Sequence, residues 1–154
     1  MMVNHIDKKN NPIMVNVGDK DITKRIAEAQ GEVFFDKISF KKIEKLKSKK
    51  GSIKNIAIVA GIMGAKETSR LIPLCHNIPI DSVNVEIKKN IKMHSLKVTA
   101  KVQTSSKTGV EMEALTAVTI SCLTIYDMCK YLNKSIIIKN IKLISKIGGK
   151  STNF

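Results

Sequence analysis

Hydrophobic and polar residues alternate along three stretches of the chain, which is the period of a β-strand with one buried face. The first stretch is Ala27–Phe35, and the next two are residues 83–87 and 96–102. The last two stretches predict a β-hairpin, because only a short polar turn separates them. A final apolar stretch within residues 135–145 predicts a fourth strand.

Apolar residues at helical spacing predict a first, short helix after the first strand. Phe40, Ile43 and Leu46 would share one face of this helix, and Ser39 is its predicted N-cap. Residues 48–51, with the sequence Ser-Lys-Lys-Gly, predict a basic loop after it.

A second helix is predicted over residues 52–71, and it contains Gly61 and Gly64. Two glycines three residues apart lower the intrinsic stability of a helix, but they let another backbone approach closely. We therefore expect tight packing at these glycines. Pro73 and Pro79 bracket an irregular stretch that follows the helix.

A third helix is predicted over residues 110–132, and it is apolar on more than one side. One stripe contains Leu115, Val118, Cys122, Ile125, Cys129 and Leu132, whereas Ile120, Leu123 and Tyr131 lie on the other side. A domain of 154 residues rarely covers such a helix completely. We expect oligomerisation to cover part of it.

The predicted order is strand, helices, strand, strand, helix, strand. This order predicts an α+β fold, a ferredoxin-like split β-α-β sandwich with an antiparallel sheet. Residues 1–17 are rich in Asn and Lys and predict a flexible N-terminal arm, and residues 18–154 predict a single domain.

The chain has 27 basic residues against 13 acidic ones, a formal net charge of +14. Such a charge favours an anionic partner: nucleic acid, a membrane surface or a phosphorylated small molecule. Biased composition is the competing explanation, because all the basic residues except Arg25 and Arg70 are lysine. The two hairpin strands contain no aromatic residue, which disfavours an RNA-recognition sheet.

The chain shows no secretory signal pattern at its start and no apolar run long enough to span a membrane. Its three cysteines are Cys75, Cys122 and Cys129, an odd number without a Cys-x-x-Cys pair. These features argue against a disulfide framework and favour a reducing cytoplasm. Cys122 and Cys129 fit the apolar stripe and are expected to be packing thiols.

Residues 91–154 contain ten lysines but only three acids, Glu111, Glu113 and Asp127. All three acids fall in the third helix, which favours a set of acid–base carboxylates in a basic pocket over mere surface charge. Asp127 has apolar neighbours at helical spacing, so it needs a partner or a raised pKa, and Lys130 is at i+3. The alternatives are a structural ion pair for Asp127 and dipole-stabilising N-terminal acids for the two glutamates.

Two further segments are candidates for anion binding. His76 lies between two prolines, where a plain loop histidine is the alternative, and adjacent Cys75 makes a poor metal co-ligand. Lys146 precedes Gly148-Gly149-Lys150, which could present backbone N–H and ammonium groups to phosphate. The spacing is not that of a P-loop.

Four segments in order resemble the cyclic pyranopterin monophosphate synthase family, the accessory protein C of molybdenum cofactor biosynthesis. They are LIPLCH at residues 71–76, KTGVEMEALTA at 107–117, LTIYDMCK at 123–130 and K-x-GGKS at 146–151. The resemblance extends over about residues 14–154. It implies conversion of 3′,8-cyclo-7,8-dihydroguanosine 5′-triphosphate to cyclic pyranopterin monophosphate, with release of diphosphate.

The resemblance also implies roles for individual residues. Asp127, Lys50 and Lys130 would be catalytic, with Asp127 as general acid/base. The substrate-binding residues would be Leu74, Cys75, His76, Glu111, Met112, Glu113, Lys66, Arg70 and Lys146.

The resemblance further implies a homohexamer, a trimer of dimers, with active sites between subunits. No metal site or resident cofactor is expected, although Mg²⁺ could accompany the triphosphate. Nucleic acid and membrane are not expected partners. Asn16, Asn77 and the C-terminal Ser-Thr-Asn-Phe depart from the usual family pattern, but none of them replaces a residue assigned to chemistry.

Overall fold

An antiparallel sheet of four long strands forms one layer of the molecule. The structure is a computed structural model that describes residues 6–7, 9–43, 45, 47–48 and 51–149. The strands lie in the order β4-β5-β1-β6. Their bounds are β1 (Thr23–Phe34), β4 (Ser82–Asn90), β5 (Ser95–Ser106) and β6 (Ile137–Ile147). The predicted α+β class and antiparallel sheet are confirmed, whereas the ferredoxin-like assignment stays a prediction.

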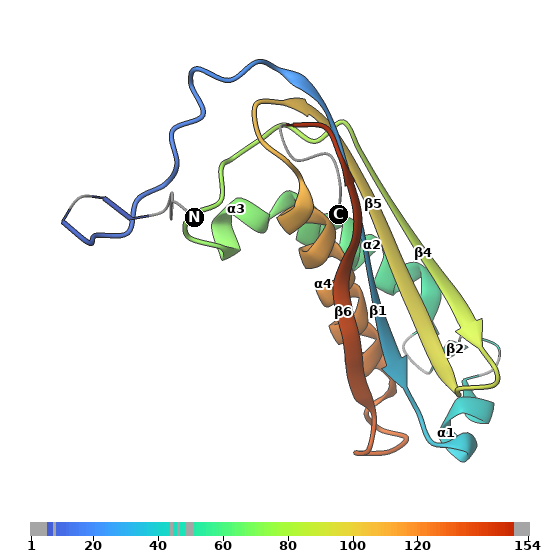
Figure 1. Cartoon of the computed structure of the whole chain (residues 1–154). Helices are drawn as coiled ribbons and strands as arrows, with labels where there is room; N and C mark the ends of the chain where they lie inside the picture. The colour runs from blue at the N-terminus through green and yellow to red at the C-terminus, as the bar shows by residue number, and fades with distance from the viewer. Residues whose placement is uncertain (1–5, 8, 44, 46, 49–50, 150–154) are drawn as a thin grey trace.

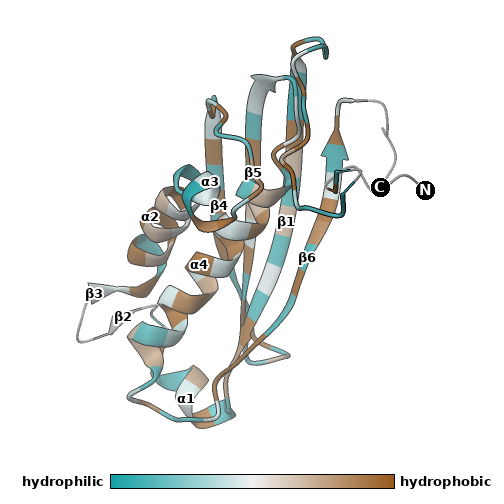
Figure 2. Ribbon diagram, turned by 90° about the vertical axis from the view of Figure 1, so that its left-hand side faces the viewer, coloured by the Kyte–Doolittle hydropathy of each residue, from teal (hydrophilic) through white to brown (hydrophobic). Residues whose placement is uncertain are grey.

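The helices form a second layer on one face of this sheet (Figure 1, Figure 2). Helix α4 packs against β1, β5 and β6, and α2 packs against α4 and β4. A small hairpin precedes α2. The bounds of these elements are α1 (Lys37–Lys42), β2 (Lys47–Ser48), β3 (Gly51–Ser52), α2 (Ile53–Lys66), α3 (Thr68–Leu71) and α4 (Glu111–Cys129).

The first helix begins earlier than predicted. Asp36 is its N-cap, because the Asp36 carboxylate accepts hydrogen bonds from the backbone N–H groups of Ile38 and Ser39, each at 2.9 Å. The prediction of Ser39 as N-cap is therefore wrong, and Ser39 is buried inside the helix. Phe40 and Ile43 are buried as predicted, whereas Leu46 lies outside the described residues.

The predicted helix over residues 52–71 begins as expected but is not continuous. Ser52 caps α2 by accepting a hydrogen bond from the Asn55 N–H at 3.2 Å. The helix ends at Lys66, and a separate short helix, α3, follows Glu67. Within residues 48–51, predicted as a loop, Ser48 and Gly51 instead belong to the paired strands β2 and β3, and the two lysines between them lie outside the described residues.

Strand and helix ends also differ from the predictions by a few residues. Strand β1 begins at Thr23 and so extends beyond the alternating stretch, and β5 continues to Ser106, past the alternating stretch 96–102. Helix α4 begins at Glu111 and ends at Cys129, so it is shorter than predicted. The predicted hairpin is confirmed as β4 paired with β5, and the final strand as β6.

The glycines of α2 pack directly against α4, as the sequence predicts. A Cβ atom on Gly61 would lie 2.9 Å from the carbonyl oxygen of Ala117, and one on Gly64 would lie 3.0 Å from the Cβ of Ile120. The hydroxyl of Ser121 adds a hydrogen bond across this interface to the carbonyl oxygen of Ala57, at 2.9 Å. Close packing therefore fixes how α4 lies on the rest of the core.

Helix α4 is only partly covered. Cys122 and Cys129 are fully buried, which confirms them as packing thiols, and all three cysteines of the chain are free. Burial raises the pKa of Cys122 to about 12. By length and composition α4 could span a membrane, but half of it is buried inside this structure, as in a core helix of a soluble protein. Leu123 and Tyr131 are exposed.

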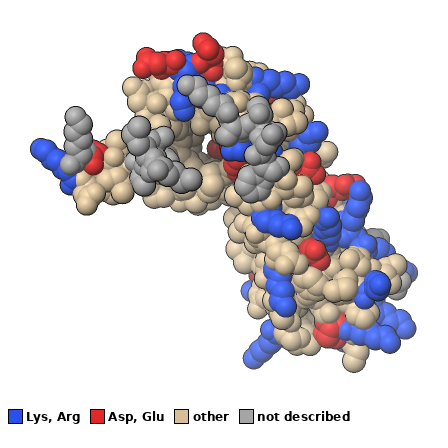
Figure 3. All heavy atoms as spheres, viewed as in Figure 1, with Lys and Arg blue, Asp and Glu red and all other residues tan. Residues whose placement is uncertain are grey.

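The opposite face of the sheet is polar. Glu28 pairs in register with Lys101, and Glu32 with Lys97, so opposite charges face each other across β1 and β5. Strands β4 and β5 contain no aromatic residue. In the view of Figure 3, Lys and Arg side chains are spread over the surface instead of gathering in one patch.

Candidate functional site

The N-terminal end of α4 carries two of the three predicted acids. Glu111 and Glu113 lie in its first turn, where a negative charge interacts favourably with the helix dipole. Glu113 is only 4% exposed. Burial raises the pKa of the Glu113 carboxyl, and the nearby Glu111 charge raises it further, while a backbone hydrogen bond opposes the shift. The first turn therefore holds a buried acid beside a more accessible one.

The loop between α3 and β4 brings three more predicted residues to this place. Leu74, Cys75 and His76 line a pocket of about 280 Å³, together with Met112 and Glu113 of α4. Burial raises the pKa of the Cys75 thiol, and the Glu113 charge adds to this effect. Residues from two segments that are far apart in sequence thus share one cavity.

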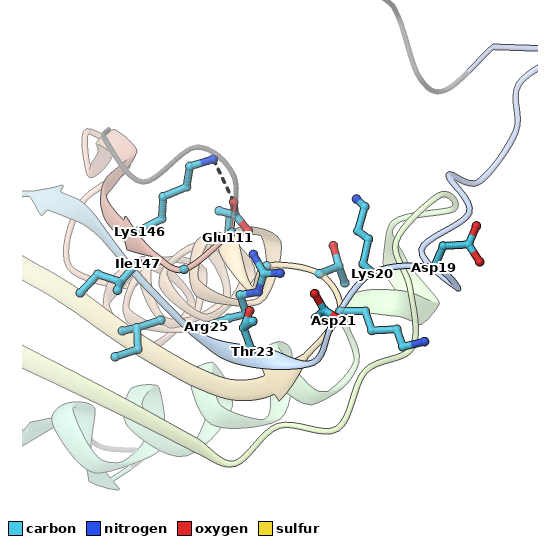
Figure 4. A pocket seen from close by; sticks show the side chains of 14 residues that line it. Asp19, Lys20, Asp21, Thr23, Arg25, Glu111, Lys146 and Ile147 are labelled. Atoms are coloured by element: carbon cyan, nitrogen blue, oxygen red, sulfur yellow. Dashed lines mark ion pairs between the residues drawn. The ribbon is translucent and has the colours of Figure 1, made fainter.

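A larger pocket of about 540 Å³ adjoins this one, because Glu111 lines both. Lys146 of β6 forms an ion pair with Glu111 at 3.3 Å, and both side chains are largely buried, at 25% and 31% exposed. Figure 4 shows Lys146 reaching Glu111, with Arg25 of β1 beside the pair. This pocket combines four cations with three carboxylates, Asp19, Asp21 and Glu111, so it is suited to an anionic ligand that also carries N–H donors.

The wall of the larger pocket includes the glycine pair that follows Lys146. Gly148 and Gly149 have positive φ angles of 94° and 90°, which favour glycine. A side chain at either position would also collide with the backbone of Lys24 or the guanidinium of Arg25. The glycines therefore let β6 end directly against Arg25.

Arg25, Lys20 and Lys107 line the larger pocket, although none of them was predicted as a site residue. Arg25 donates a hydrogen bond to the carbonyl oxygen of Ser106 at 3.4 Å. The rarity of arginine in this lysine-rich chain could have singled out Arg25 as a candidate site residue. Alternation along a strand does not reveal which loops meet at its end.

The N-terminal segment also contributes to the site. Val15 and Val17 line the smaller pocket, and the carbonyl oxygen of Val15 lies 2.7 Å from Nε2 of His76. His76 is therefore engaged with the chain's own backbone, and it is not a plain solvent-facing loop residue.

Two predicted binding residues lie outside both pockets within this chain. Lys66 lines a third pocket of about 410 Å³, which adjoins the smaller pocket because Ile78 lines both. Arg70 is exposed and forms an ion pair with Glu67 at 3.2 Å.

The predicted catalytic pair lies at the opposite end of α4. Asp127 and Lys130 form an ion pair at 2.8 Å, as predicted, but their side chains are 52% and 58% exposed. The hydrogen bond and charge of Asp127 raise the pKa of Lys130. At 1.5 Å per residue, about 24 Å along the helix axis separates Asp127 from Glu111. The third predicted catalytic residue, Lys50, lies outside the described residues.

The apolar surroundings expected for Asp127 are not a closed environment in the single chain. Leu123 and Tyr131 are themselves exposed, at 54% and 55%. Among the residues that the structure describes, no group of three or more His, Cys, Asp or Glu side chains could hold a metal ion.

Comparison with known proteins places the chain among a large set of relatives. Residues 14–149 match the MoaC family. The chain is 47% identical over 154 residues to a cyclic pyranopterin monophosphate synthase of Helicobacter pylori (strain Shi470), covering all of this chain and 98% of that protein. It is 48% identical over 154 residues to the enzyme of the same name from Helicobacter hepaticus (strain ATCC 51449 / 3B1), again over all of this chain and 97% of the relative.

A similar match comes from outside that group of bacteria. The cyclic pyranopterin monophosphate synthase of Clostridium botulinum (strain Alaska E43 / Type E3) is 49% identical over 151 residues, covering 98% of this chain and 95% of the relative. These matches include both ends of α4, the Leu74–His76 loop and Lys146. The chain belongs to the MoaC family.

Proposed function

We propose that this protein is a cyclic pyranopterin monophosphate synthase of molybdenum cofactor biosynthesis. It would convert 3′,8-cyclo-7,8-dihydroguanosine 5′-triphosphate to cyclic pyranopterin monophosphate and release diphosphate. The observation that carries the proposal is full-length similarity to enzymes of that name. The pocket that contains Glu111, Lys146 and Arg25 offers groups of the right chemistry for such a substrate.

Substrate binding is assigned to the N-terminal end of α4. The cations Lys146 and Arg25 would neutralise the triphosphate, because charges are needed to hold it in a confined site, and His76 would add a contact from the smaller pocket. Glu111 and Glu113 would accept hydrogen bonds from the N–H edge of the guanine-derived ring. Leu74, Cys75 and Met112 would complete the wall of the smaller pocket.

Proton transfer is assigned to Asp127 as general acid/base, with Lys130 holding its charge state and Lys50 as a second catalytic group. These residues must meet the substrate, yet Asp127 lies far from the pocket within one chain. We therefore assign a complete site to two copies, the pocket from one and the Asp127 end of α4 from the other. Lys66 and Arg70 would likewise act from a neighbouring copy or on a part of the substrate outside the pockets.

Exposed apolar side chains on the helical layer support such an assembly. Val59 and Met63 of α2 are 56% and 60% exposed, and Leu123 of α4 is exposed as well. Residues of this kind usually face a partner when they occur together. We propose a homohexamer, a trimer of dimers, acting in the cytoplasm without a resident metal or cofactor. Any Mg²⁺ would enter with the triphosphate.

The net charge of +14 would suit a nucleic-acid-binding module, but neither the sheet nor the relatives favour this alternative. The sheet lacks aromatic residues on β4 and β5, and the relatives are named as enzymes.

The test is turnover by the purified full-length chain. Incubation with 3′,8-cyclo-7,8-dihydroguanosine 5′-triphosphate should yield cyclic pyranopterin monophosphate and one diphosphate per product, measured by chromatography and a diphosphate assay. Absence of turnover by folded protein, with a known synthase active in parallel, would contradict the proposal.

A further inference from the structure

The N-terminal segment formed by residues 15–21, here called the strap, is fastened to the body of the protein at two points. His76 lies 2.7 Å from the carbonyl oxygen of Val15 through its Nε2 atom. The ammonium group of Lys107 donates a hydrogen bond to the carbonyl oxygen of Gly18. The two fastening residues come from different loops, one before β4 and one after β5.

The strap also has a defined backbone between the two fasteners. The Asn16 side chain accepts a hydrogen bond from the N–H of Gly18 at 2.8 Å. The N–H of Lys20 donates to the carbonyl oxygen of Val17 at 3.1 Å. These two turns are local, so they shape the strap but do not hold it to the protein.

The strap forms part of the wall of both pockets. Val15, Val17 and Lys20 line the smaller pocket, and Asp19, Lys20 and Asp21 line the larger one. Figure 4 shows Asp19, Lys20 and Asp21 on the side of the larger pocket opposite Lys146. Without the strap both cavities would lose one side. Lys20, the strap residue common to both, would lose its position.

We infer that Lys107 is a positioning residue, whose bond to Gly18 holds the strap in place as a wall of the binding site. Although Gly18 is exposed to water, a bond from an ammonium group is stronger than one between neutral groups. Lys107 thereby sets the position of Lys20, which is the strap's cation for an anionic ligand. The inference deepens the proposed function and rests on it only for the identity of that ligand.

Hydrogen exchange on the full-length, ligand-free protein tests the fastening directly. Lys107→Met should speed exchange of the amides in residues 15–21 by about tenfold, while the core strands keep wild-type rates. Lys107→Arg, which keeps a charged donor, should restore slow exchange. Lys101→Met is the matched control, because Lys101 is an exposed lysine of β5, the strand that Lys107 follows. Wild-type exchange of the strap in Lys107→Met would overturn the inference.

Affinity for inorganic triphosphate separates positioning from direct binding. If Lys107 acts through the strap, Lys107→Met should weaken binding much less in a Lys20→Met background than in the wild type. An equal loss in both backgrounds would overturn the inference, because Lys107 would then contact the ligand itself. His76→Ala, which releases the other fastener, should independently speed exchange near Val15, and an unchanged rate there would count against a fastened strap.

The inference about Lys107 and the proposed enzymatic activity can be contradicted independently of each other. Strap exchange that depends on Lys107 in a protein without turnover would support the inference and contradict the function. Normal turnover, together with strap exchange that Lys107→Met leaves unchanged, would support the proposed function and contradict the inference.

Discussion

The two ends of α4 differ in how completely the chain surrounds them. At the N-terminal end Glu113 is almost fully buried, and Glu111 forms an ion pair with Lys146 inside a pocket. At the C-terminal end the Asp127–Lys130 pair stands on an exposed surface. The acids at one end line two pockets, whereas the charged pair at the other end is about half exposed.

This difference supports the proposal that a single chain holds two partial sites. A general acid/base needs a substrate within hydrogen-bond reach, and about 24 Å of helix is too far for one small molecule to bridge. The exposed apolar residues beside Asp127 are consistent with a second copy that covers this end. Substitutions at each end test whether the Asp127 end transfers protons and the Glu111 end binds substrate.

The largest effect is expected at the exposed end. Asp127→Asn should lower kcat by about 10²- to 10⁴-fold, because the amide cannot transfer the proton. Melting temperature should hardly change, since an exposed ion pair contributes little to stability. Glu86→Gln is the matched control: Glu86 also forms an exposed pair, with Lys88 at 2.9 Å, but lies on the sheet. Near-normal turnover by Asp127→Asn would remove the catalytic role.

A smaller effect, on binding, is expected at the buried end. Lys146→Met should weaken the affinity for inorganic triphosphate by about 10- to 100-fold, because it removes a charged donor from the pocket. Titration calorimetry measures this, and Lys142→Met on the same strand provides an exposed control. If both variants bound equally well, the larger pocket would not be the triphosphate site.

The third effect concerns stability and its dependence on pH. The pKa of Glu113 is raised by burial, so the folded protein binds this proton more tightly than the unfolded chain. The free energy of unfolding should therefore fall as pH rises from the ordinary glutamate pKa through the raised value. Glu113→Gln should remove this contribution to the decline, and Asp127→Asn should keep it.

Urea unfolding at a series of pH values measures both slopes. An identical pH dependence in Glu113→Gln and the wild type would show that the buried end carries no energetic cost of ionisation. The two ends of α4 would then differ only in the solvent exposure of their charged side chains, and not in the energetic cost of ionising them.

The sequence predicted the elements of the fold better than their ends. Alternation in β4 and β5 and the apolar stripe of α4 follow directly from which faces are buried. The cap of α1 was missed because Asp36 and Ser39 are both good N-cap residues, three positions apart. The break at Glu67 was missed because the residues around it are all compatible with a helix.

The site could be predicted residue by residue but not in its arrangement. The motifs identified Glu111, His76 and Lys146, and the structure places these around adjoining pockets. Arg25 and Lys107 were missed because their positions depend on which strand ends and loops meet. The separation of Asp127 from the pocket follows from the unbroken length of α4, which the predicted helix already implied.

Mixing two variants with defects at opposite ends of α4 tests the shared site most directly. Asp127→Asn and Lys146→Met, unfolded and refolded together in equal amounts, should regain about a quarter of the wild-type activity at substrate concentrations below KM. Under random pairing, a quarter of the sites combine an intact Lys146 pocket from one chain with an intact Asp127 from the other. Refolding Asp127→Asn with Lys130→Met, which share the same defective end, is the control and should regain none. Activity of the first mixture no higher than the average of its two parents would contradict a site built from two copies.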